Sequence, residues 1–143
     1  MAKADFVHLT QDGVSLLIDL SQNSAEIVHW GQALGRVESI ANFTKAAMEP
    51  VAHAELDDPM YQSIWRENSR GNTGLPAILG HSAGKRFSQK FEIVSVEQTP
   101  IQATITGRDD HAKLEVTNRY RFLGGGSWGL PKVFETSPAN LSR

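Results

Sequence analysis

The sequence predicts a mainly β protein: an antiparallel β-sandwich with one short helix near residues 38–48. Two stretches predict the sheets, because apolar and polar residues alternate over Val14–Leu20 and again over Ala112–Phe122. A period of two is typical of strands that bury one face. A third stretch predicts the helix, since apolar residues between Val37 and Met48 recur at helical spacing.

The chain begins with two predicted hairpins that share a strand. Phe6–Leu9 is a short apolar run, and Gln11-Asp12-Gly13 is typical of a hairpin turn into Val14–Leu20. After a polar turn the chain returns as Glu26–Trp30. We expect Trp30 to be a core residue, buried beneath this hairpin as its aromatic anchor.

A helix and a long loop are predicted next. We expect a helix over Glu38–Met48, with its apolar stripe packed on the sheet and Pro50 just beyond its end. Between Pro50 and Lys90 the regular pattern largely disappears, and prolines and glycines are interspersed with aromatic residues. A loop of this length in a compact domain is usually functional or packs against another surface. Residues 50–90 are therefore predicted to be an ordered loop that covers a neighbouring surface.

Strands are predicted again after this loop. Phe91–Glu97 is strand-like, and its alternation slips between Ile93 and Val94, which indicates a bulge. Ile101–Ile105 alternates in turn, and Gly107–Asp110 is the predicted turn before the last strand. That last strand has the cleanest pattern, apolar on one face and charged on the other. It is expected to run antiparallel to its predecessor.

Beyond Phe122 neither alternation nor a helical period is visible. Residues 123–143 end in a stretch rich in Ser, Pro and Asn, and the pattern offers no partner for the last predicted strand. We therefore expect a β-sandwich domain over residues 1–122, including the loop 50–90, followed by an unpatterned tail over 123–143. This organisation predicts a sheet that the chain completes only in part.

The composition argues against several classes of function. The chain has 143 residues and a formal net charge of −2, whereas nucleic-acid-binding domains usually present a basic face. It has no cysteine, which excludes disulfides and thiolate metal sites. No apolar run approaches the ~18 residues of a membrane span, and the N-terminus lacks the apolar core of a signal peptide. We expect a cytoplasmic protein with no nucleic-acid and no membrane partner.

No cofactor or metal is predicted either. The five histidines are scattered, whereas a zinc site needs clustered ligands. Asp109-Asp110 falls in a predicted turn, where a solvated role is expected. Asn68–Gly74 lacks both the form of a phosphate loop and a preceding strand. Trp30 and Trp65 could each stack on a sugar; core packing is favoured for Trp30, and both roles stay open for Trp65.

Three stretches carry a resemblance to a known family. They are VSLLIDL–IVHWGQALG with its HWG, Ala54–Pro59 (AELDDP), and GLPAILGHSAGKRFSQKF before the closing hairpin. In order and spacing, over about residues 6–122, they resemble the N-terminal domain of bacterial α-galactosidases of glycoside hydrolase family 36. The resemblance implies a supersandwich-like β domain in front of a (β/α)8 barrel. It also implies retaining hydrolysis of terminal α-D-galactosides by two aspartates on that barrel.

The resemblance implies no catalytic residue in this chain, because both aspartates belong to the barrel. In the family the loop after the helix reaches towards the sugar site, in some members that of a neighbouring subunit, so a homo-oligomer is compatible with it. By position, Asp57, Asp58 and Trp65 are the implied substrate-binding residues. Two hypotheses follow: an α-galactosidase accessory domain, cut short and inactive alone, or a self-standing carbohydrate- or protein-binding β-module. The unpatterned tail favours the first.

Overall fold

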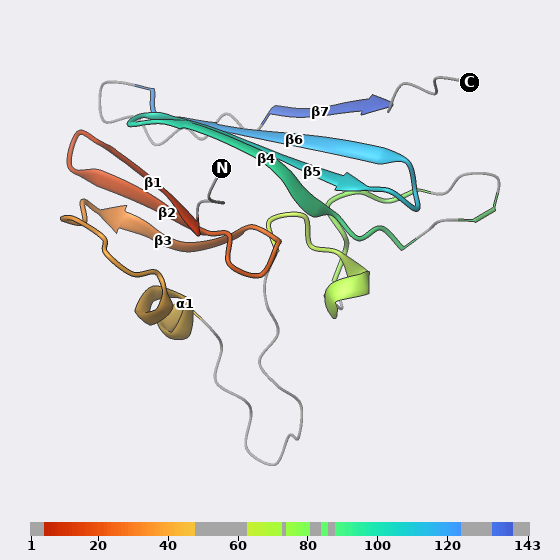
Figure 1. Cartoon of the computed structure of the whole chain (residues 1–143), viewed down its shortest axis with the longest axis horizontal. Coiled ribbons are helices and arrows are strands. Elements are labelled where there is room, and N and C mark those ends of the chain that lie inside the picture. The colour runs from red at the N-terminus through yellow and green to blue at the C-terminus, as the bar shows by residue number, and fades with distance from the viewer. Residues whose placement is uncertain are drawn as a thin grey trace, which may run out of the picture.

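Two antiparallel sheets lie face to face in the computed structural model, and a short helix flanks the first of them (Figure 1). The structure describes residues 5–47, 63–72, 74–80, 84–85, 88–123 and 133–138. The first sheet has the order β1-β2-β3 and the second the order β4-β5-β6-β7. The strands are β1 (Phe6–Gln11), β2 (Val14–Asp19), β3 (Glu26–Gln32), β4 (Glu92–Thr99), β5 (Gln102–Asp109), β6 (Leu114–Arg121) and β7 (Val133–Pro138). The predicted mainly β, sandwich-like fold class is confirmed.

The first sheet consists of the two hairpins that the sequence predicts. Asp12 and Gly13 join β1 to β2 with φ angles of 50° and 79°, both in the left-handed region. A two-residue turn of this hand matches the twist of the flanking strands, and glycine adopts it without strain. β2 then pairs with β3, with a register irregularity between Leu17 and Ile18.

Strand β2 is buried on both of its faces, although its alternation predicts only one buried face. Leu16 and Ile18 belong to the core between the sheets, whereas Ser15, Leu17 and Asp19 point the other way and are equally buried. The segment that follows β3 covers this second face. The Leu34 N–H donates to Ser15 Oγ at 2.9 Å, and Thr44 Oγ1 donates to Asp19 Oδ2 at 2.6 Å.

The helix α1 (Ala41–Ala47) lies within the predicted range but begins three residues later than Glu38. It contacts β3, where the rings of Phe43 and His29 meet edge to face with centroids 6.3 Å apart. The helix therefore packs on the sheet as expected, although none of its own residues is fully buried. Ile40, just before the helix, supplies the buried contact instead.

The second sheet reproduces the predicted bulge and shifts the predicted turn. The register of β4 against β5 slips between Ile93 and Ser95, which confirms the bulge at Val94. β5 runs on to Asp109, so the turn falls at residues 110–113 rather than 107–110. The reason is the carboxylate of Asp109, which accepts the N–H groups of His111 and Ala112, both at 2.8 Å, and so turns the chain after the strand.

The region beyond Phe122 contains a strand that its sequence pattern does not predict. β7 pairs antiparallel with β6 from Leu114↔Pro138 to Arg119↔Val133. The last predicted strand therefore has a neighbour on each side, contrary to the expectation from the sequence pattern. Apart from Leu123, which is exposed, the remaining residues of the tail lie outside the described part of the chain.

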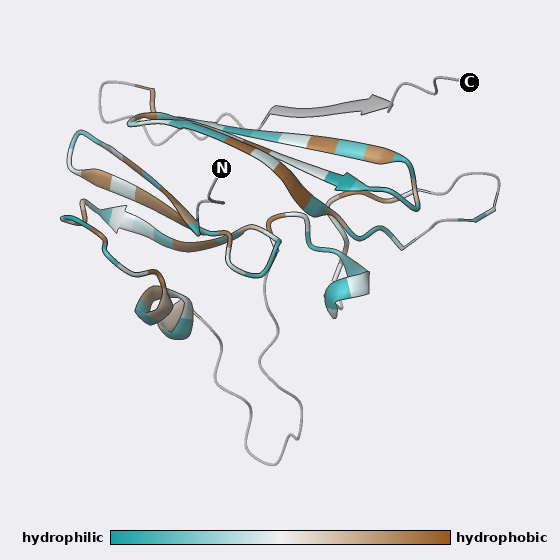
Figure 2. Cartoon of the chain, viewed as in Figure 1, coloured by the Kyte–Doolittle hydropathy of each residue, from teal (hydrophilic) through white to brown (hydrophobic). Residues whose placement is uncertain are grey.

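The core lies between β1 and β2 on one side and β5 and β6 on the other (Figure 2). Backbone hydrogen bonds tie the two sheets together as well. The Thr10 N–H donates to Pro100 O at 3.1 Å, and the Ile93 N–H donates to Asn23 O at 3.2 Å. The core residues are Val7, Leu9, Leu16, Ile18, Leu20, Ala25, Trp65, Phe91, Ala103, Ile105, Val116 and Tyr120.

Trp30 is not among these core residues, and the expectation that it anchors the hairpin from beneath is wrong. Its side chain is 42% exposed, although its cross-strand partner Leu16 is buried. The physical reason is the position of β3 at the edge of its sheet opposite β1. The second sheet covers the β1 edge, where β1 contacts β5 and Thr10 is bonded to Pro100. Val7 and Leu9 are therefore buried there, whereas Trp30 on the other edge stays partly open.

Candidate functional site

Trp65 is the one candidate substrate-binding residue whose surroundings the structure describes, and it lies in the core. Its side chain is 1% exposed, and its ring packs against Phe91 with centroids 5.7 Å apart. Its Nε1–H donates to Asn118 Oδ1 at 2.9 Å in the middle of β6. With both ring faces covered, Trp65 cannot stack on a sugar in this structure, so that expectation is corrected to a core role.

Glu67 and Arg70 hold the segment that follows Trp65 to the start of β4. Glu67 Oε1 accepts the Phe91 N–H at 2.5 Å, and Arg70 Nη2 donates to Phe91 O at 2.8 Å. The two side chains also approach each other, with Arg70 Nε 3.2 Å from Glu67 Oε2. Neither of these two atoms has an aligned hydrogen bond, so this contact is an ion pair rather than a directed bond. Glu67 directly precedes the short 3-10 helix Asn68–Arg70, and Arg70 is the last residue of that helix.

Further hydrogen bonds complete what we call the loop anchor, which comprises residues 63–72 and the residues to which they are bonded. Ser69 Oγ donates to Gln89 O at 2.5 Å, and the Ala77 N–H donates to Trp65 O at 3.1 Å. On the adjacent strand, Asp109 Oδ2 accepts the Lys90 N–H at 2.8 Å. The anchor therefore holds the middle of the 50–90 loop against the sandwich. Its role in this structure is to position the loop.

The other two candidate residues, Asp57 and Asp58, lie outside the described residues. Sequence reasoning missed the residues of the loop anchor, above all Glu67 and Arg70. The signal that the sequence holds for them is the i, i+3 spacing of opposite charges, which favours an ion pair on a helical turn.

A second polar cluster lies on the outer face of the first sheet. His8 Nε2 is 3.1 Å from Ser15 Oγ and 3.0 Å from Thr10 Oγ1, and the two hydroxyl oxygens are 2.9 Å apart. Burial, together with the nearby His29, lowers the pKa of His8 below its usual 6.5. A serine beside a histidine suggests a nucleophile and its base. Ser15 is fully buried, however, and its Oγ accepts the Leu34 N–H, so the cluster fixes the 33–47 segment instead.

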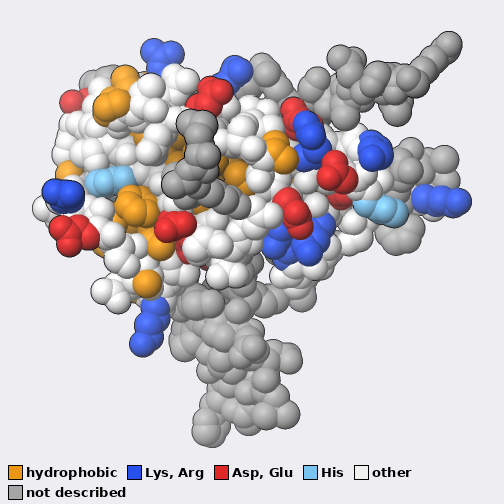
Figure 3. All heavy atoms as spheres, in the orientation of Figure 1, with side chains coloured by type: hydrophobic (Ala, Val, Ile, Leu, Met, Phe, Trp, Pro, Cys, Tyr) orange, Lys and Arg blue, Asp and Glu red, His pale blue; other side chains and the backbone are white. Residues whose placement is uncertain are grey.

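Hydrophobic side chains also reach the surface at several places (Figure 3). Leu75 and Leu79 are 81% and 76% exposed in the stretch that follows the loop anchor. On β3, Ile27 is exposed together with Trp30. Within the described residues Trp30 is thus the tryptophan available for contact with a ligand or a partner.

Metal ligands and membrane-spanning helices were also sought in the described part of the chain. No three His, Asp or Glu residues there are grouped as metal ligands, and no helix there is long and apolar enough to cross a membrane. No protein-family model matches the chain, and no curated protein is significantly similar to it in sequence.

Proposed function

We propose that this chain is the N-terminal accessory domain of an α-galactosidase of glycoside hydrolase family 36. The enzyme would hydrolyse terminal α-D-galactosides on a separate (β/α)8 barrel domain, by the retaining mechanism with two carboxyl groups roughly 5 Å apart. The setting would be cytoplasmic, and the substrate would meet this domain only in the assembled enzyme.

The observation that carries the proposal is where the motifs of the resemblance fall in the fold. The hairpin with the HWG motif forms β2 and β3, and β2 is the most enclosed strand of the first sheet. The stretch that begins at Gly74 follows the loop anchor in the sequence and precedes β4. The hairpin motif thus builds most of the first sheet, the stretch from Gly74 precedes the second sheet, and Ala54–Pro59 lies outside the described residues. The place of the hairpin motif supports an accessory domain of that kind.

The loop anchor supports a specific role for the loop 50–90. Substrate contact by a loop needs a fixed end, because positioning a carboxylate against a hydroxyl requires preorganisation. Trp65, Glu67 and Arg70 provide that end on the second sheet. Asp57 and Asp58, several residues before the anchor, are the proposed contacts to the sugar in the assembled enzyme, and Trp65 holds the loop in place.

Fragment complementation tests this proposal. The chain is added to a family 36 α-galactosidase from which the N-terminal domain has been deleted, and hydrolysis of an aryl α-galactoside is followed. We expect no turnover by the chain alone and a gain in activity on mixing. The double variant Asp57→Asn/Asp58→Asn should lower this gain, whereas Asp110→Asn, at an exposed turn on the second sheet, should not. Turnover by the chain alone, or no gain and no association on mixing, would contradict the proposal.

The exposure of Trp30 favours a second candidate, a stand-alone carbohydrate- or protein-binding module. An exposed indole can stack on a pyranose ring, and an edge strand can accept a partner strand. Titration of galactose or melibiose into a Trp128→Phe chain distinguishes the two candidates by fluorescence, because a bound sugar would contact the exposed Trp30 and not the buried Trp65. Saturation in the micromolar range, lost in Trp30→Phe, would favour the module. The accessory-domain proposal expects millimolar binding at best, about −4 kcal/mol.

A further inference from the structure

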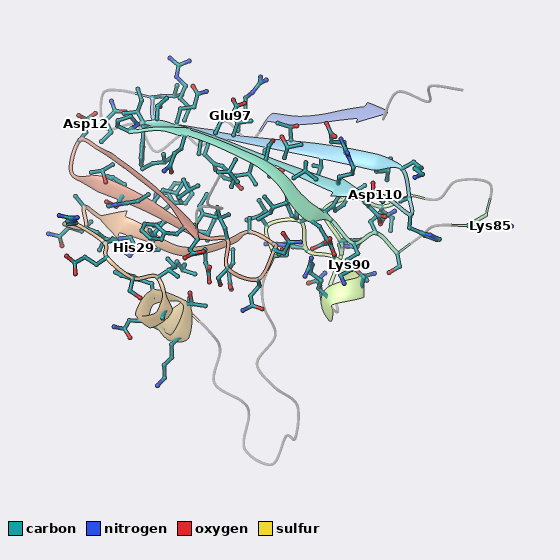
Figure 4. The ribbon with its side chains drawn as sticks, viewed as in Figure 1. Asp12, His29, Lys85, Lys90, Glu97 and Asp110 are labelled. Carbon is teal, nitrogen blue, oxygen red and sulfur yellow. The ribbon has the colours of Figure 1, made fainter. Side chains whose placement is uncertain are left out.

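The tip of the β1–β2 hairpin is the dipeptide Asp12-Gly13, in which the aspartate side chain can react with the backbone that follows it. Asp12 is the only aspartate in the sequence that glycine follows. Its side chain lies at the far end of the molecule from the β5–β6 turn with Asp110 (Figure 4). Both Asp12 and Gly13 are exposed, and both have left-handed backbone angles, φ 50° and φ 79°.

A backbone nitrogen can attack the side-chain carboxyl carbon of the preceding aspartate when nothing hinders it. Gly13 has no Cβ, and no other atom lies within 4 Å of the place where a Cβ would be. The carbonyl of Gly13 accepts the Ala33 N–H at 2.8 Å. Among the described residues, however, the Gly13 N–H donates no hydrogen bond, so the nitrogen is free to lose its proton and attack.

The carboxylate of Asp12 is equally unrestrained, in contrast to the two buried aspartates. Asp19 accepts hydrogen bonds from the Ser21 N–H and from Thr44 Oγ1. Asp109 accepts three backbone N–H groups. Within the described part of the chain no group donates to the carboxylate of Asp12, so its carboxyl carbon can rotate towards the Gly13 nitrogen.

We propose that Asp12 is a site of spontaneous isomerisation to isoaspartate. The Gly13 nitrogen forms a bond to Cγ of Asp12, a carbon–oxygen bond of that carboxyl group breaks, and one water leaves to give a cyclic succinimide. Water then adds to the former main-chain carbonyl of Asp12, and the ring opens. The chain now runs through Cβ, and the former main-chain carbonyl carbon carries the free carboxylate. The mass is unchanged and no oxidant is needed.

The product would not fit the hairpin as it stands. The backbone of the two-residue turn would gain one carbon atom, whereas the closing pair Gln11↔Val14 spans a fixed distance. The turn also presents the Gly13 carbonyl to the Ala33 N–H, which helps to hold the 33–47 segment over the first sheet. Isomerisation would therefore loosen the hairpin tip and the tie to that segment together.

The test is an ageing experiment on the full chain in native buffer at physiological temperature and pH. Isoaspartate is measured by enzymatic carboxyl methylation and located by fragmentation of the proteolytic peptides. We expect it at Asp12, several-fold more than at Asp5 or Asp110, exposed aspartates followed by Phe6 and His111. Asp12→Glu, which cannot form the five-membered ring, should abolish the signal. It should keep the native circular dichroism spectrum, which shows that the signal is not lost through unfolding.

A comparison with the same chain aged in denaturant shows which results would contradict the proposal. If Asp12 isomerises in denaturant, but in the native chain does so no more than Asp110, the hairpin protects the dipeptide and the proposal is wrong. The same holds if the methylated site in the native chain is not Asp12. This test is independent of any galactosidase activity, so the two proposals can fail separately.

Discussion

Replacing Gly107 by Ala tests the packing around Trp65 directly. A Cβ at Gly107 would lie 2.6 Å from Cη2 and 2.7 Å from Cζ2 of Trp65, and 3.2 Å from Cβ of Phe91. Carbon atoms in favourable contact are about 3.5–4.0 Å apart, so the indole would have to move by roughly 1 Å. It has little freedom to do so, because it is buried and its Nε1–H is bonded to Asn118.

The expected cost follows from these contacts. Overpacking a filled core destabilises by about 1–3 kcal/mol, and a displaced indole would also weaken a buried hydrogen bond worth about 1 kcal/mol. The backbone of Gly107 is not left-handed, so alanine adds no backbone strain. A smaller opposing effect, about 0.4–1 kcal/mol, comes from the reduced entropy of the unfolded chain. We expect the free energy of unfolding to fall by about 1.5–3 kcal/mol.

Urea unfolding followed by far-UV circular dichroism measures this cost. Gly35→Ala is the matched control, because no atom lies within 4 Å of its added Cβ, and it should change stability by less than about 0.5 kcal/mol. Trp65→Phe removes the atoms that clash, so its combination with Gly107→Ala should be less destabilising than the sum of the single changes. A Gly107→Ala protein as stable as Gly35→Ala, or strict additivity with Trp65→Phe, would refute this view of the core.

Three further outcomes are expected from urea or thermal unfolding. Trp30→Ala should cost only about 1–2 kcal/mol, because the side chain is half-exposed, and a loss of 3–5 kcal/mol would show that it is a core residue after all. Asp109→Asn should cost about 2–3 kcal/mol, since one amide oxygen must replace a carboxylate that accepts three N–H groups, and a neutral result would contradict that network. Burial raises the pKa of Tyr120 from 10.0 to about 12. The folded state then holds a proton that the unfolded state loses, so stability should fall between about pH 10 and pH 12, by about 2–3 kcal/mol in all. Tyr120→Phe should remove this part of the pH dependence and leave the rest.

The hairpins could be predicted from the sequence because their signals are local. Alternation defines β2 and β6, the Asp12-Gly13 turn fixes the first connection, and the slip beside Ile93 identifies the bulge in β4. Each of these features depends on neighbours only a few residues away. The features that the sequence pattern did not predict depend on contacts between residues that are far apart in the sequence.

The two tryptophans illustrate this difference. Both are aromatic residues beside polar ones, and nothing within a few residues of either tells which is buried. Trp65 is buried because its loop returns to β6, where Asn118 accepts its N–H from 53 residues away. Trp30 is exposed because β3 is the edge strand opposite β1, whereas β1 is the edge that contacts β5 of the second sheet. The pattern of a single strand predicts neither the order of strands nor which edge the other sheet covers.

The same reasoning applies to the helix, to β7 and to the candidate site. The covering of the second face of β2 by the 33–47 segment depends on two side-chain contacts, Ser15 with Leu34 and Asp19 with Thr44. β7 is defined by its pairing with β6 rather than by its own composition. Asp57 and Asp58 come from a resemblance of position and fall outside the described residues, so their role stays a prediction.

The double burial of β2 has a consequence for the motions of the domain. Amide hydrogens exchange with solvent when the structure opens locally or globally, and the most enclosed strands exchange last. The amides of β2 are bonded to β1 and β3 within the sheet, with the core on one face and the 33–47 segment on the other. They should exchange only through global unfolding and so report the stability of the whole domain. The amides of β3 should exchange earlier, by fraying from the edge, so deuterium uptake would separate the centre of this sheet from its margin.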